Sequence, residues 1–159
     1  MSTKPKDQPQ AVLPANVSDK VRAFLSQAKA IPGSGREKIL VVEDDADVRR
    51  VTREVLESSG YQIWEAADVP EALNLWQINA SKIDLLVTDI VLPGRLNGWD
   101  LVARLRKERP GLKVILISSF AVHQKERNQS RDPILPKPFS LECLTETVRK
   151  CLDTAHRAD

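Results

Sequence analysis

The stretch DLLVTDI, residues 84–90, is a short apolar run that closes on an aspartate, Asp89. Its apolar residues are continuous and do not alternate with polar ones, which is typical of a strand buried on both faces. A similar run occurs four more times along the chain: KILVV (38–42), YQIWEA (61–66), KVILIS (113–118) and PILP (133–136). A segment with helically spaced apolar residues follows each run. This alternation predicts an α/β fold in which helices wrap a parallel sheet.

Polar side chains stand where the expected strands end. Glu43 and Asp44 follow the first strand, Asp89 ends the third, Ser118 ends the fourth, and Lys137 follows the fifth. In an open parallel sheet these carboxyl ends form the ligand-binding edge, so the side chains should converge there. Carboxylates that share a site repel one another unless a cation intervenes, which indicates a hard divalent metal, with Mg²⁺ as the best fit. A carboxylate beside such a metal can act as a nucleophile toward a phosphoryl group.

Four motifs carry a family resemblance over about residues 38–154. The chain resembles the CheY-like receiver domain of two-component response regulators in the segments ILVVEDD (39–45), VTDIVLPGRLNG (87–98), VILISSFA (114–121) and LPKPF (135–139). The resemblance implies a flavodoxin-like (βα)5 three-layer sandwich with strand order 2-1-3-4-5. It also implies an aspartate that accepts a phosphoryl group from a phosphohistidine on a partner kinase.

The resemblance assigns the metal ligands and the phosphoacceptor residue by residue. Asp89 matches the phosphoacceptor, and Glu43 and Asp44 match the acidic pair that serves Mg²⁺. The backbone carbonyl of Val91 matches the position that completes the protein ligands of the metal. Asp45 falls one place beyond the acidic pair.

The resemblance also assigns the residues that handle the phosphoryl group. Ser118 matches the hydroxyl residue that moves toward it, Ser119 matches the small neighbour, and Lys137 matches the lysine that pairs with phosphate. The Lys137-Pro138 bond matches a peptide bond that is cis in this family, a geometry that is accessible before proline.

Three features depart from the usual receiver pattern. The loop after Asp89 is one residue longer and resembles the loop of receivers fused to histidine kinases. The segment between Ser118 and Lys137 is short, so we expect a truncated or irregular helix near 121–130. Ile134 stands where the family often has Tyr or Phe, so an aromatic switch at that position is not available.

The rest of the chain sets the expected organisation and partners. Residues 1–36 hold six Lys or Arg against two Asp, and we expect a flexible arm with a short amphipathic helix at 17–31. Residues 37–156 form the expected receiver domain, which is slightly acidic and therefore an unsuitable partner for nucleic acid. No apolar run is long enough for a membrane span, and the two cysteines fit a reducing, cytoplasmic setting.

The function expected from these features is a phosphorylation-controlled switch. Its expected partners are a sensor histidine kinase or a phosphotransfer protein, and a downstream protein or a second copy of the chain. No output domain is expected after residue 156. One alternative is the receiver portion of a hybrid histidine kinase. A phosphatase that turns over an aspartyl phosphate is disfavoured, because by resemblance it needs a second acid where Val91 stands. Catalysis beyond self-phosphorylation and autodephosphorylation is not expected.

Overall fold

The computed structural model describes Ala23 and residues 36–119 and 130–154. Apart from Ala23, the helix expected at 17–31 lies outside the described residues, as does most of the segment 121–130. The five strands are parallel and lie in the order β2-β1-β3-β4-β5, which confirms the expected topology. Their bounds are β1 (Lys38–Val42), β2 (Gln62–Ala66), β3 (Leu85–Asp89), β4 (Lys113–Ser118) and β5 (Ile134–Pro136).

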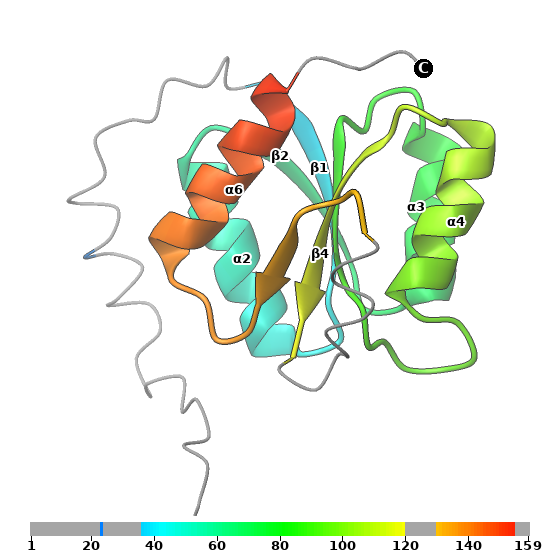
Figure 1. The fold of residues 1–159 in the computed structure, drawn as a ribbon, viewed down its shortest axis with the longest axis horizontal. Helices are drawn as coiled ribbons and strands as arrows, with labels where there is room; N and C mark the ends of the chain where they lie inside the picture. Colours follow the sequence, from blue (N-terminus) through cyan, green and yellow to red (C-terminus); the bar gives the residue numbers. More distant parts are fainter. Residues whose placement is uncertain (1–22, 24–35, 120–129, 155–159) are drawn as a thin grey trace, which may run out of the picture.

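Four helices are described, and they cover the two faces of the sheet. They are α2 (Ala46–Ser58), α3 (Val69–Asn79), α4 (Gly98–Glu108) and α6 (Leu141–Asp153). Figure 1 shows α2 and α6 on one face and α3 and α4 on the other. The molecule is therefore a three-layer sandwich, as its alternating sequence pattern predicts.

The core consists of two apolar layers, one on each side of the sheet. Successive residues of a strand point to opposite faces, so Ile39 and Val41 pack toward α2 and α6, and Leu40 and Val42 pack toward α3 and α4. The central strand β3 is buried along its whole length. This double burial explains why its first three residues, Leu85–Val87, are all apolar.

Helix starts follow local capping rules. The side chain of Asp45 accepts hydrogen bonds from the backbone N–H groups of Asp47 and Val48 and so begins α2. Asn97 and Asp100 form a reciprocal capping box at the start of α4. These caps fix where each helix leaves the carboxyl end of the preceding strand, and thereby fix the loops that surround the candidate site.

The strand order reverses beside β1, whose two neighbours are β2 and β3. A crevice at such a reversal, outside the carboxyl ends of the strands, is where open α/β sheets bind ligands. Glu43 and Asp89 stand at the ends of β1 and β3. Among the described residues, no helix combines the length and apolar character that crossing a bilayer requires.

Candidate functional site

Three carboxylates meet at the carboxyl ends of β1 and β3. Glu43, Asp44 and Asp89 each offer an oxygen, and these oxygens lie within 4.8 Å of one another. Glu43 and Asp89 are buried, with exposed fractions of 1% and 5%, whereas Asp44 is exposed. All the donor atoms are oxygens and one side of the group is open to solvent, which fits a hard divalent cation that keeps some of its waters.

Lys137 supplies a positive charge to the two buried carboxylates. Its Nζ donates hydrogen bonds to Glu43 Oε2 at 2.7 Å and to Asp89 Oδ2 at 2.6 Å. The lysine follows β5, and its backbone N–H donates to the carbonyl of Ser118 at the end of β4. The Lys137-Pro138 peptide bond is cis, as the motif predicts. The site therefore joins the ends of four strands that are far apart in the sequence.

Burial and charge act in opposite directions on this group. Burial raises the pKa of the Glu43 carboxyl, and the hydrogen bond and charge of Lys137 oppose that rise only in part. Burial lowers the pKa of Lys137, but its hydrogen bonds to Asp89 and Glu43 outweigh that effect and leave the pKa raised. Lys137 thus stays protonated, and a further positive charge nearby would stabilise the ionised form of the buried Glu43 carboxyl.

Backbone groups and one arginine hold the acidic side chains in place. Asp89 Oδ1 accepts a hydrogen bond from the backbone N–H of Val91 at 2.8 Å, and Glu43 Oε1 accepts one from the N–H of Asp45 at 3.1 Å. Arg49 Nη1 donates to the carbonyl oxygens of Glu43 at 2.6 Å and of Asp44 at 3.3 Å. Nothing in the sequence pattern singled out Arg49, although its place one turn into α2 allows it to reach back to this loop.

Gly98, the first residue of α4, touches the backbone of the strand end that carries Asp89. Its N–H donates to the carbonyl of Ile90 at 2.9 Å. A Cβ atom at this position would lie 2.2 Å from the carbonyl oxygen of Asp89, so only glycine fits. The motif VTDIVLPGRLNG contains this glycine, but only the packing of α4 on β3 shows why a glycine is required there.

The structure does not place every expected residue in contact with the carboxylates. Ser118 is buried, and its hydroxyl donates to the carbonyl of Ser119 at 2.8 Å. Within the described part of the chain, no hydrogen bond joins that hydroxyl to Asp89 or Lys137. Val91 contributes its N–H to Asp89, and its side chain is 59% exposed.

Comparison with known proteins gives one family and several relatives. The family described as the response regulator receiver domain matches residues 39–149. A curated sensor kinase, CckA of Brucella abortus, is 38% identical over 128 residues, which are 79% of this chain and 13% of the kinase. The transcriptional regulator NtrC of Rhizobium meliloti is 36% identical over 118 residues, which are 72% of this chain and 24% of that protein. The chain thus spans less than a quarter of the length of either relative.

Solved structures agree with these sequence matches. The receiver domain of the hybrid histidine kinase CckA is 35% identical and has a TM-score of 0.62, with 73% of this chain and 99% of that chain covered. The receiver domain of NtrX from Brucella abortus is 30% identical and has a TM-score of 0.65, with 74% and 99% covered.

Proposed function

The chain belongs to the family of response regulator receiver domains, and from that premise we propose that it is a signalling switch that is phosphorylated on Asp89. The observation that carries the proposal is the set of contacts around the Asp89 carboxylate. One of its oxygens lies 2.6 Å from Lys137 Nζ, and the group shares a pocket with Glu43 and Asp44. A receiver is a phosphoacceptor and not a classical enzyme, so the chemistry required of the site is limited.

The proposed reaction is the transfer of a phosphoryl group to Asp89. An oxygen of the Asp89 carboxylate forms a bond to phosphorus, the phosphorus–nitrogen bond of the phosphohistidine breaks, and its electron pair stays on the imidazole. Lys137, already hydrogen-bonded to Asp89, is placed to contact the incoming phosphoryl oxygens. The N–H of Val91 orients the carboxylate by holding its other oxygen.

The same pocket provides ligands for a divalent metal. Glu43, Asp44 and Asp89 supply the acidic oxygens, and the backbone carbonyl of Val91 is the proposed fourth protein ligand. When bound there, Mg²⁺ would offset the negative charge of the phosphoryl oxygens. Its two positive charges would also stabilise the ionised Glu43 carboxylate, whose pKa burial raises and Lys137 lowers only in part.

Ser118 is proposed to respond to phosphorylation. Its hydroxyl must leave the carbonyl of Ser119, which it contacts at 2.8 Å, before it can donate to a phosphoryl oxygen on Asp89. The exchange replaces a neutral hydrogen bond by one to a charged acceptor, which is the stronger kind. This change is the local event from which the switch would start.

Histidine kinases phosphorylate receiver domains, and we propose a sensor histidine kinase or a phosphotransfer protein as the donor. The phosphorylated chain would act in the cytoplasm through contacts with a downstream protein or a second copy. We propose residues 37–156 as the receiver unit and residues 1–36 as a separate segment before it. The receiver portion of a hybrid histidine kinase is a second candidate, favoured by the similarity to CckA in sequence and in structure.

Phosphorylation by acetyl phosphate tests the proposal. We expect the wild type to incorporate one phosphoryl group by intact-mass spectrometry in the presence of Mg²⁺, and none in the presence of EDTA. Asp89→Asn should incorporate none. Asp45→Asn is the matched control, because asparagine also caps a helix and Asp45 lies outside the cluster. Incorporation in Asp89→Asn, or without metal, would contradict the proposal.

A further inference from the structure

Helix α3 carries apolar side chains on its outer side as well as on the side that faces the core. Trp76 faces the core and is 1% exposed. Ile78 comes two residues later, about 200° around the helix, and points away from the core. Its side chain is 77% exposed, and Leu75, one turn before it, is half-buried. A helix that is apolar all round is normally buried, so the outer side of its last two turns is suited to contact with another apolar surface.

The outer sides of the other described helices are charged. Arg50 pairs with Glu54 along α2, and Lys150 faces Glu146 along α6. Helix α4 exposes Arg104. Water solvates such side chains well, so these helices need no cover. Within the described ranges, the last two turns of α3 differ because they expose an apolar side chain and hold no charged residue.

The chain enters the receiver domain beside this part of α3. The N–H of Lys38, the first residue of β1, donates to Asp84 Oδ2 at 2.8 Å, and the N–H of Asp84 donates to the carbonyl of Lys38 at 2.8 Å. Ile83 donates its N–H to the carbonyl of Asn79, the last residue of α3, at 3.2 Å. These contacts bring the last turn of α3 close to the start of β1, and therefore to the end of residues 1–36.

Residues 17–31 carry the pattern of an amphipathic helix, whose apolar side needs cover. The apolar residues recur at helical spacing: Val17, Val21, Phe24, Leu25, Ala28 and Ile31. Apart from Ala23, this segment lies outside the described residues. Ala23 is helical and exposed, and it belongs to the polar side of the pattern. Residues 32–36 can span up to about 17 Å, which allows a helix that ends at Ile31 to reach α3.

We propose that residues 17–31 dock as an amphipathic helix on the outer side of the last two turns of α3 in the same chain. The apolar side of the segment would cover Leu75 and Ile78. The segment holds three basic residues and one acidic residue, and Glu71 is the only charged residue of α3, so charge does not oppose the contact. The docking surface lies away from Asp89, so the proposal does not depend on phosphorylation.

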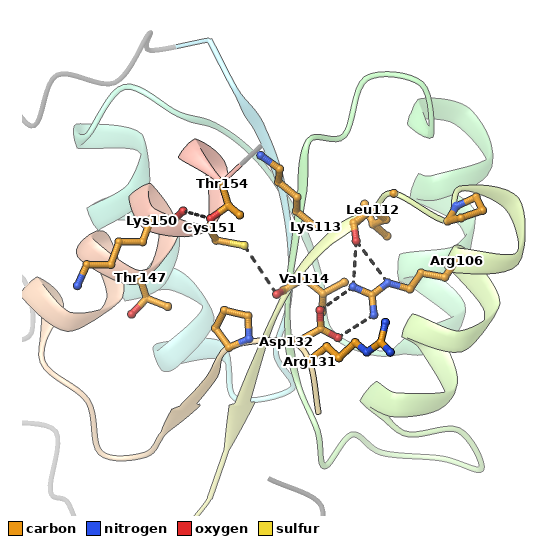
Figure 2. A pocket seen from close by; sticks show the side chains of 13 residues that line it. Arg106, Leu112, Lys113, Val114, Arg131, Asp132, Thr147, Lys150, Cys151 and Thr154 are labelled. Carbon is orange, nitrogen blue, oxygen red and sulfur yellow. Dashed lines mark hydrogen bonds and ion pairs between the residues drawn. The ribbon is translucent and has the colours of Figure 1, made fainter. Parts of the chain in front are cut away.

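A cavity at the same end of the sheet is the competing place for this segment. Its volume is about 520 Å³, and it lies between the start of β4, the segment before β5 and the later turns of α6. Figure 2 shows Lys113, Arg131 and Lys150 around it. These cations would repel the basic segment, so charge favours α3 over the cavity.

Nuclear magnetic resonance of the full, unphosphorylated chain tests the proposal. An isolated helix of about 15 residues is only marginally stable in water, so helical Cα shifts across residues 17–31 report docking. Ile78→Glu should abolish these helical shifts, because it places a charge in the apolar contact. Phe24→Ser combined with Leu25→Ser should abolish them too, and should move the amide signals of residues 74–79.

Matched variants separate docking from added charge and from helix propensity. Gln77→Glu adds the same charge to the last turns of α3, but on another side of the helix. Ala23→Ser combined with Ala30→Ser adds two serines to the polar side of the segment. Both should keep the helical shifts of the wild type. Ile78→Glu should leave the fold intact, because Ile78 is largely exposed, and unchanged amide signals from the strands check this.

Any of four results overturns the proposal. These are coil shifts for residues 17–31 in the wild type, helical shifts that survive Ile78→Glu, amide signals of 74–79 that do not respond to the paired Phe24 and Leu25 substitutions, or responses confined to the cavity residues 111–114 and 147–154. Helical shifts that grow with protein concentration would also overturn it, since they would show docking on a second copy of the chain.

Discussion

At the scale of single residues, Arg49 shows how a side chain outside the carboxylate cluster can shape it. Its guanidinium donates to the carbonyls of Glu43 and Asp44, and the 2.6 Å contact to Glu43 is the shorter of the two. Glu43 and Asp44 are the acidic pair of the site, so Arg49 fixes the backbone from which both carboxylate side chains project. We regard it as a positioning residue for the metal site.

Replacing Arg49 with alanine should weaken Mg²⁺ binding. Loss of a hydrogen bond from a charged donor costs about 1.5 kcal/mol or more. If this whole loss enters the free energy of Mg²⁺ binding, the association becomes roughly tenfold weaker. Isothermal titration with MgCl₂ measures this directly and requires no phosphorylation. Arg50→Ala is the control, because within the described ranges Arg50 pairs only with the exposed Asp47 and the half-exposed Glu54 on its own helix. Equal affinity in the two variants would refute a positioning role.

At the scale of elements, the close approach of α4 to the end of β3 decides the geometry around Asp89. Gly98 allows this approach, because a side chain there would collide with the Asp89 carbonyl. The capping box of Asn97 and Asp100 fixes the first turn of the same helix. The loop before it contains Gly94, which has a positive φ of 98°; apart from its two chain neighbours, no residue that the structure describes has an atom within 4 Å of a Cβ built there.

Two glycine substitutions separate packing from backbone strain. Gly98→Ala should destabilise the fold by about 2–3 kcal/mol, because α4 must shift away from β3 to relieve the overlap. Gly94→Ala should cost about 1 kcal/mol, from the positive φ alone. Urea unfolding followed by tryptophan fluorescence gives both values. The account of α4 fails if Gly98→Ala is no more destabilising than Gly94→Ala.

At the scale of the whole molecule, Arg149 connects α6 to the residues that directly precede β1 and β2. Its guanidinium contacts Glu37 at 3.1 Å and the hydroxyl of Tyr61 at 3.4 Å, and it also pairs with Asp153 on its own helix. Tyr61 precedes β2, and only 5% of its surface is exposed. Burial raises the pKa of the Tyr61 phenol, and the nearby Arg149 charge opposes that rise only in part.

The raised pKa predicts a loss of stability at alkaline pH. In the unfolded chain the phenol ionises near pH 10, whereas in the fold it stays neutral to a higher pH. This contribution to stability is therefore complete below about pH 10 and is lost as the pH rises through the folded-state pKa. Tyr61 is the only tyrosine, so the ultraviolet absorbance of phenolate reports on it alone.

The measurement compares native protein with protein unfolded in urea. We expect the native midpoint to lie above the unfolded one, and Tyr61→Phe to remove this part of the alkaline loss of stability. A native midpoint at or below the unfolded value would show that the charge of Arg149 outweighs burial.

The sequence by itself determined which polar residues follow each strand and where the capped helices begin. A continuous apolar run marks a strand that is buried on both faces. Capping residues such as Asp45 and Ser140 act within one turn of the helix that they begin. Both signals are therefore local in the sequence. The carboxyl ends of parallel strands share one edge, which is why Glu43, Asp44 and Asp89 could be placed together in advance. The resemblance added their expected roles.

Only the tertiary structure decided how these residues meet. Lys137 and Glu43 are 94 positions apart, and their 2.7 Å contact depends on the packing of β5 beside β4. The burial of Glu43 beside the exposed Asp44 and the close approach of Gly98 to β3 also arise from packing between elements. Such contacts depend on how whole elements fit together, and a local pattern of residues carries no record of that fit.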